Sequence, residues 1–187
     1  MAIIKDGTGS GYTARVGSSQ KLDTSARVND RIYYTSRDDG KAFIVQFALT
    51  QAVNGVTEGV GYIKYTGTDR LNIKRICFTS EDAGMTKFGV WKNPTVSGGD
   101  AAIPVNLNFG SNITSNTTCK DDNDGTTVTI TGGTSLCTLR LNGPDTKAAE
   151  FYDALIIGPN DILGIQGNAT TAGSKVRVNI MFAESVY

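Results

Sequence analysis

The sequence of 187 residues contains no histidine. This absence excludes Ser-His-Asp and Cys-His catalysis within the chain, and it excludes zinc or iron sites built on imidazole ligands. An enzyme made from this chain would have to move protons with carboxylates, Lys, Tyr or Cys, because the side chain best suited to that task near neutral pH is missing. We therefore expect a protein that is not an enzyme and that has no catalytic residues, no metal and no cofactor.

Cysteine is also scarce. Cys77, Cys119 and Cys137 are an odd number of thiols, and their spacing matches no zinc-binding pattern. Pairing of Cys119 with Cys137 across neighbouring strands is one alternative. We favour the other, in which all three are reduced thiols that act as small apolar side chains.

An excess of charge and long apolar runs are both absent. Lys and Arg number 18, as do Asp and Glu, so the formal net charge is zero. This balance argues against a general nucleic-acid or anionic-membrane binder, which would be clearly basic. No run of apolar residues reaches membrane-spanning length, and the N-terminus lacks the basic start and apolar core of a secretory signal. We expect no nucleic-acid or membrane partner, and synthesis in a cytoplasm.

The first 30 residues are rich in Gly, Ser, Thr and charge, and residues 7–11 form a Gly-rich spacer. Their large apolar residues do not repeat at a helical period and cannot bury enough surface to offset the entropy of ordering the segment. Chain ends of this kind are ordered only where contacts hold them. We predict that residues 1–30 form an extended arm that binds a partner through Ile3, Ile4, Tyr12, Val16, Leu22 and Val28.

The pattern after residue 30 is that of a β protein. Short runs of strand-forming residues are separated by turn dipeptides such as Asn54-Gly55 and Gly132-Gly133. So many short strands indicate a sandwich or a barrel, and polar connections at 66–70 and 111–125 suit Greek-key crossings. We predict that residues 31–187 form one all-β domain, a jelly-roll-like antiparallel β-sandwich, with strands over 31–34, 41–50, 61–65, 71–79, 86–91, 102–109, 126–131, 134–141, 154–157, 162–165 and 176–182.

Local patterns predict finer details. A period of two assigns one buried face to Ile103, Val105, Leu107 and Phe109, and another to Val176, Val178, Ile180 and Phe182. A phase slip within residues 71–78 predicts a β-bulge near Lys74-Arg75. Gly132-Gly133 predicts a hairpin between the strands on either side of it. Residues 146–155 are the one stretch with a helical pattern.

Carboxylates are the remaining candidates for chemistry. Residues 120–125 (KDDNDG) do not match the spacing of an EF-hand loop, so we interpret them as an acidic solvated loop rather than a calcium site. A glycosidase would need two carboxyl groups across a cleft, and the nearest pairs are Glu81-Asp82 and Glu150 with Asp153. We interpret the first pair as part of a turn.

Aromatic residues offer a second kind of site. Trp91 and the tyrosines could stack on sugars, but isolated aromatics in strands more often belong to the core. Only Tyr33-Tyr34 and the pair Tyr62 and Tyr65 are dense enough to consider. Tyr62 and Tyr65 are therefore our candidate glycan-binding residues.

Several stretches of the chain resemble proteins of tailed-bacteriophage particles. They are IKDGTGSG at 4–11, ARV at 14–16, KLDT at 21–24, WKNPT at 91–95, PVNLN at 104–108 and GPND at 158–161. The resemblance covers about a quarter of the residues and is a style of sequence rather than a catalytic motif. It implies a structural subunit that decorates or cements a capsid, or belongs to a tail or fibre, and a homo-oligomer, with a trimer favoured.

Together these observations lead to two alternatives. The first is a capsid decoration or cement protein of a virion, anchored through its N-terminal arm on the major capsid protein or another virion subunit by strand addition. The second is a tail or fibre subunit whose β domain binds a host glycan.

Overall fold

The computed structural model describes residues 2–5, 13–16, 22–23, 40–123 and 126–185. Every regular element in these ranges is a β-strand. No helix among the described residues is long and apolar enough to cross a membrane. The prediction of an all-β chain is thus confirmed.

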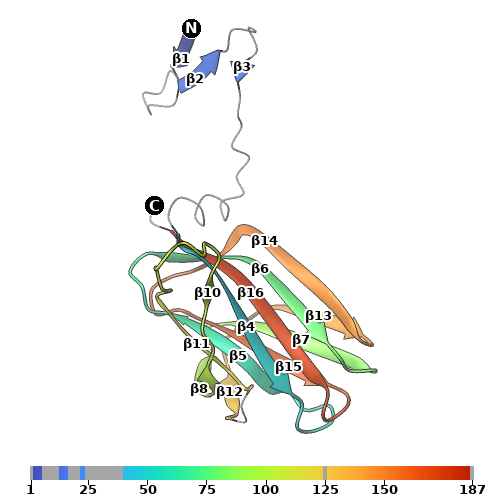
Figure 1. Cartoon of the computed structure of the whole chain (residues 1–187). Coiled ribbons are helices and arrows are strands. Elements are labelled where there is room, and N and C mark those ends of the chain that lie inside the picture. The colour runs from blue at the N-terminus through green and yellow to red at the C-terminus, as the bar shows by residue number, and fades with distance from the viewer. Residues whose placement is uncertain (1, 6–12, 17–21, 24–39, 124–125, 186–187) are drawn as a thin grey trace.

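A small sheet near the N-terminus is separate from the rest. It contains β1 (Ala2–Lys5), β2 (Thr13–Val16) and β3 (Leu22–Asp23), paired antiparallel in the order β1-β2-β3. Ile3 pairs with Arg15, and Val16 pairs with Leu22. These strands belong to neither sheet of the body and are drawn apart from it in Figure 1. Where we expected one extended arm, the described residues form strands that pair with one another.

The body consists of two sheets. The first has the order β10-β4-β16-β6-β14, and the second β13-β7-β15-β5-β11-β9, with β12 paired to β5 and β8. All of these strand pairs are antiparallel. The strands are β4 (Ala42–Thr50), β5 (Glu58–Tyr65), β6 (Arg70–Ser80), β7 (Met85–Lys92), β8 (Thr95–Gly98), β9 (Asp100–Ala101), β10 (Val105–Asn106), β11 (Thr117–Asp121), β12 (Val128–Thr131), β13 (Thr134–Asn142), β14 (Asp145–Ile157), β15 (Ile162–Ala169) and β16 (Lys175–Ser185).

The strand pairs of the body are nested. β4 pairs with β16, β5 with β15, β6 with β14 and β7 with β13, so that the early strands of the body pair with the late ones in reverse order. Successive pairs alternate between the sheets, giving β4-β16-β6-β14 in one and β13-β7-β15-β5 in the other. This is a long double-stranded ribbon rolled into two layers, the topology of a jelly roll. The predicted fold class is confirmed.

The connection between β7 and β13 is long and carries β8 to β12. There the prediction of a hairpin at Gly132-Gly133 is wrong, because β12 pairs with β8 and β13 pairs with β7. Both glycines have positive φ, at 65° and 85°. They turn the chain from the pair of β12 with β8 into the pair of β13 with β7, opposite the turn that joins β7 to β8. The dipeptide gives a turn but does not determine which strands become neighbours.

The bulge in β6 is confirmed. Across β16, Met181 pairs with Arg75 while the next residue, Phe182, pairs with Ile73, so Lys74 is the extra residue of β6. The extra residue brings Ile73 and Ile76 to the same buried face although their positions differ by an odd number. A single inserted residue therefore restores one apolar face along the strand.

The helical expectation for residues 146–155 is wrong. These residues lie in β14, which pairs with β6 along most of its length. The register shifts between Glu150 and Leu155, so the irregular spacing that looked helical accommodates a wide bulge in an edge strand. Backbone pairing with an exposed sheet edge decided the structure over local periodicity.

The buried face predicted for residues 103–109 is also wrong. Only Val105 and Asn106 form a strand there, and they pair with Ile44 and Phe43 at the edge of the first sheet. Ile103 is 80% exposed and Phe109 is 92% exposed. The segment lies at the sheet edge, and within the described part of the chain these side chains are left uncovered.

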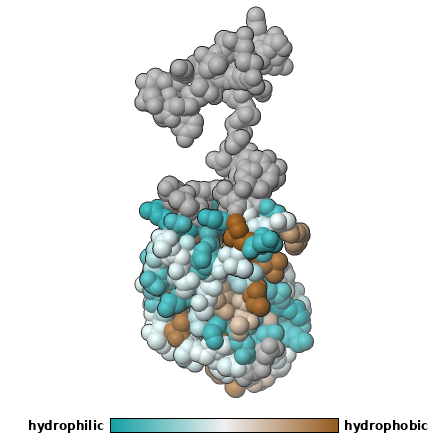
Figure 2. Space-filling view, turned by 60° about the vertical axis from the view of Figure 1, so that its left-hand side comes forward, coloured by the Kyte–Doolittle hydropathy of each residue, from teal (hydrophilic) through white to brown (hydrophobic). Residues whose placement is uncertain are grey.

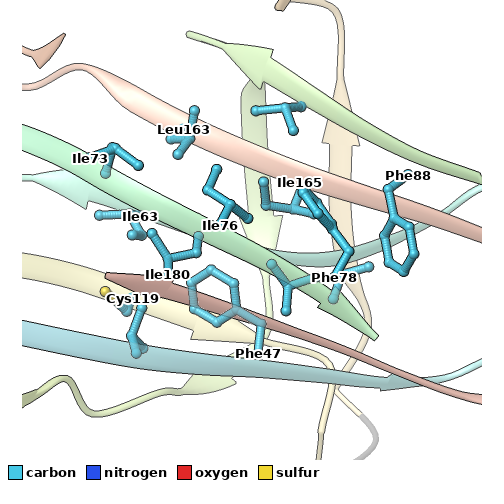
Figure 3. Close-up of a cluster of buried hydrophobic side chains, with 14 of the residues drawn as sticks. Phe47, Ile63, Ile73, Ile76, Phe78, Phe88, Cys119, Leu163, Ile165 and Ile180 are labelled. Carbon is cyan, nitrogen blue, oxygen red and sulfur yellow. The ribbon is translucent and has the colours of Figure 1, made fainter. Parts of the chain in front are cut away.

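The core lies between the two layers. Phe47, Phe78 and Ile180 of the first sheet meet Ile63, Phe88 and Ile165 of the second, as Figure 3 shows. The predicted inward face of the last strand is confirmed, because Val176, Val178, Ile180 and Phe182 are fully buried. A second cluster, formed by Tyr62, Val128 and Ile130, lies on the other side of β5 beneath β12.

Candidate functional site

The carboxylates considered for catalysis are engaged elsewhere. Glu81 accepts a hydrogen bond from the guanidinium of Arg177 at 2.6 Å, and Glu150 forms an ion pair with Arg75 at 2.9 Å. The side chain of Asp153 lies outside the described residues. The two glutamates are thus paired with arginines at the surface of the first sheet.

Asp82 is buried and fastens two turns to each other. Its carboxylate accepts hydrogen bonds from the N–H of Gly84 (3.0 Å), the N–H of Thr170 (2.6 Å) and the hydroxyl of Thr170 (2.8 Å). Burial alone would raise the pKa of Asp82, but these bonds and one from Thr171 lower it to about 2. The prediction that Glu81-Asp82 forms a turn agrees with this arrangement.

The low pKa of Asp82 predicts how the free energy of unfolding changes in acid. Since the folded-state pKa of Asp82 lies below its ordinary value of 3.8, the carboxylate stabilises the fold fully above about pH 4. That contribution is lost as the pH falls towards about 2. Asp82→Asn should lower the free energy of unfolding at neutral pH by about 2 kcal/mol and flatten its fall between those pH values. Urea denaturation across that range measures both effects, and an equally steep fall in the variant would contradict the assignment.

The acidic loop at 120–125 is partly used for structure. Asp121 is buried, and its Oδ2 accepts the N–H of Ala48 at 3.0 Å beyond the end of the β10 pairing. Burial raises the pKa of Asp122, with the N–H of Val128 acting in the opposite direction. Asp124 and Gly125 lie outside the described residues. Among the residues that the structure describes, no group of three or more Cys, Asp and Glu side chains is placed to hold a metal ion.

The three cysteines are free thiols. Cys119 is on β11 and Cys137 on β13, and β7, β15 and β5 lie between those strands. They therefore do not face each other across neighbouring strands, and the pairing alternative is wrong. Burial raises the pKa of Cys119 to about 12, which keeps that thiol protonated and unreactive.

The tyrosines proposed for glycan binding are in the core. Tyr65 is 1% exposed and Tyr62 is 7% exposed, on opposite faces of β5. Neither ring has an open face on which a sugar could stack, so this prediction needs correction. Tyr33 and Tyr34 lie outside the described residues. Sequence spacing could not separate buried tyrosines from exposed ones because β5 is covered on both faces.

The predicted anchors of the arm are distributed as follows. Ile3 and Ile4 lie in β1, Val16 in β2 and Leu22 in β3. Four of the six predicted residues thus lie in the small sheet, where the register puts Ile4, Val16 and Leu22 on one face and Ile3 on the other. Tyr12 and Val28 lie outside the described residues. The prediction that these residues bind a partner stays a prediction.

A surface that sequence reasoning missed lies beside β10. We call Ile103, Val105, Phe109 and Ile113 the β10 surface; each is between 43% and 92% exposed. Figure 2, which brings the left side of Figure 1 forward, shows hydrophobic side chains among hydrophilic ones below the grey residues. The sequence does not show that the residues of the β10 surface are exposed, because the alternation of residues 103–109 is that of a half-buried strand.

The loop that carries the β10 surface is fastened to Gly40. The side-chain amide of Asn106 donates to the carbonyl of Gly40 at 2.7 Å and to that of Ile113 at 2.9 Å. Glu184, which is buried, accepts bonds from Ser115 and Asn116 and so holds the end of this loop against β16. An apolar surface is thus fixed next to residue 40.

Comparisons with known proteins give little. No protein-family model and no curated protein matches the sequence. Among solved structures, a chain of the T=1 particles derived from infectious bursal virus is similar at 13% identity, with a TM-score of 0.20. The match covers 77% of this chain and 40% of the viral chain. A likeness at this score carries no argument about fold or function, so the residues themselves must carry the proposal.

Proposed function

We propose that the protein is a non-enzymatic structural subunit of a virus particle, of the capsid-decoration or cement type, attached through residues 1–30. The observation that carries the proposal is the small sheet β1-β2-β3, which belongs to neither sheet of a body that is already a closed two-layer fold. The body has its own core, so the extra sheet is not needed to complete it.

The small sheet needs a partner for a physical reason. Its strands have four, four and two residues, and a sheet this small is stable only when a hydrophobic face is covered. In the register of this sheet, Ile4, Val16 and Leu22 share one face with Ala2 and Ala14, whereas Ile3 belongs to the other face. Contact with another subunit of the particle would cover the face of Ile4, Val16 and Leu22 and would repay the ordering entropy.

The β10 surface supports the same proposal. Four large apolar side chains are exposed within residues 103–113, and exposed apolar patches on soluble domains mark interaction sites. Their place beside Gly40 means that one neighbouring subunit can contact both the β10 surface and the N-terminal segment. We take that neighbour to be the major capsid protein, and the assembled protein to be a homo-oligomer, a trimer by preference.

The jelly-roll architecture is compatible with this role. Jelly rolls form the domains of many viral capsids and also of lectins, and a fold does not by itself fix a function. The resemblance of several stretches to proteins of tailed-phage particles favours the capsid use. A tail or fibre position is the alternative, which a glycan-binding site on the body would favour.

A surface variant tests the role of β10. The double change Ile103→Ser with Phe109→Ser should leave the thermal midpoint within about 2 °C, because both side chains are largely exposed. It should weaken co-sedimentation with particles of the virus that encodes the protein by about tenfold, since apolar contact area is lost. The matched control is Val53→Ser with Val56→Ser, two exposed residues of another loop. Unchanged co-sedimentation would mean that the β10 surface is not part of the interface.

A further inference from the structure

A hollow lies on the outer face of the second sheet, away from the β10 surface. It has a volume of about 270 Å³ and is lined by residues of β7, β13 and β15 together with Thr57. These strands are neighbours in the order β13-β7-β15 (Figure 1). Its size is just below the range of pockets for drug-sized ligands, which suits a single sugar ring.

The hollow exists because Gly89 has no side chain. Phe88 and Val90 point into the core, so Lys87, Gly89 and Trp91 face outward from β7. Thr138 of β13 and Gln166 of β15 are the direct neighbours of Gly89. A glycine at the centre of three strands therefore leaves a floor of backbone with side chains around it.

Trp91 forms the aromatic wall. A Cβ atom at residue 89 would lie 2.8 Å from Nε1 of the indole, so the ring leans over the floor. This Nε1 is buried and has no hydrogen-bond partner among the described residues. Buried indole N–H groups normally have an acceptor, which a hydroxyl entering the hollow would supply after a small rotation of the ring.

The remaining walls are polar and fixed. Gln166 donates its amide to the carbonyl of Ile130 at 2.9 Å, and Asn168 donates to the carbonyl of Gly55 at 2.7 Å. With their nitrogen atoms held, these amides present oxygen acceptors in defined positions. Lys87 adds a positive charge, and the described residues that line the hollow include no carboxylate.

From this arrangement we propose that the hollow binds a saccharide unit that carries a carboxylate. An aromatic face, amide groups and a hydroxyl are the partners that recognise the alternating apolar and hydroxyl surfaces of a sugar ring. Lys87 selects the anionic sugar, because a hydrogen bond to a charged group is stronger than a neutral one. The hollow lies on the body and uses none of residues 1–30. Attachment to a particle can therefore fail or succeed independently of saccharide binding, and binding would favour a tail or fibre position over a capsid-decoration role.

The experiment uses the only tryptophan of the chain as reporter. The full-length protein is titrated with sialic acid, glucuronic acid and glucose while emission and acrylamide quenching of Trp91 are recorded. We expect saturable protection from quenching with a millimolar dissociation constant for an acidic sugar, and affinity for glucose weaker by about tenfold. Absence of saturable protection with all three sugars would overturn the proposal.

Two variants locate the binding. Gly89→Ala places a methyl group under the indole and should abolish binding, although Trp91 remains as a reporter. Lys87→Gln should reduce affinity for the acidic sugar to that for glucose. Saturation-transfer NMR with Ile156→Ser serves as the control, since that exposed residue of β14 lies outside the hollow and outside the β10 surface, and the change should leave the affinity for the acidic sugar unaltered. Full binding by Gly89→Ala, or an undiminished acid preference in Lys87→Gln, would contradict the assignment of the site.

Discussion

Deleting residues 1–28 should leave a folded body that no longer binds virus particles. The nested strand pairs and the buried core of the body begin at β4, so the truncated chain keeps every contact between its two layers. Its thermal midpoint should stay within a few degrees of that of the full chain. Binding should fall by at least about a hundredfold, because many weak attachments on one particle multiply through effective concentration.

Co-sedimentation and circular dichroism measure the two effects separately. A finer variant replaces Ile4 and Leu22 by Ser in the full chain and should bind as poorly as the deletion. Its matched control is Ser18→Ala with Ser19→Ala, which changes the same segment without touching its apolar residues and should bind normally. If the truncated body still bound particles with full affinity, attachment through residues 1–30 would be wrong.

Replacing Phe78 by Ala should lower the free energy of unfolding by about 4 kcal/mol. Phe78 is fully buried, and its ring lies 5.0 Å from that of Phe88 on the opposite sheet. The change removes an aromatic contact between the layers and leaves a cavity that the rigid sheets cannot close. Urea denaturation followed by Trp91 fluorescence measures the loss.

Phe109→Ala is the control for this experiment. It removes the same atoms from a side chain that is 92% exposed, so its effect should stay within about 0.5 kcal/mol. The comparison also tests whether Phe109 is exposed, as in the structure, or buried, as the alternation of residues 103–109 predicts. A loss of similar size in the two variants would mean that the segment at 103–109 is covered after all.

Much of the body could be predicted from the residues alone. Val176, Val178, Ile180 and Phe182 alternate with polar residues, and that period leaves a strand only one way to bury its apolar face. The bulge at Lys74 followed from the same rule, since only an inserted residue could bring Ile73 and Ile76 to one face. Alternation is a property of each strand, so it can be recognised in the sequence without knowing which strands pair.

The candidate sites were harder to predict from the sequence. Nothing in the sequence shows that β12 covers Tyr62 on the outer face of β5, or that Tyr65 on the inner face joins the core between the sheets. The hollow at Gly89 gave no signal either, since its walls come from three strands that are distant in the chain. The sequence shows that residue 91 is aromatic, but which side chains surround Trp91 depends on the order of the strands in the sheet.

What the sequence by itself determined is the class of the fold, the inward face of its regular strands and the exclusion of histidine chemistry. Tertiary structure alone decided which strands became neighbours, and with that the course of the chain at Gly132-Gly133 and the strand at 145–157. It also decided which apolar residues stayed exposed beside β10. The physical reason is that side-chain alternation is set by each strand's own backbone, whereas pairing and coverage are set by hydrogen bonds and packing between segments far apart in the chain.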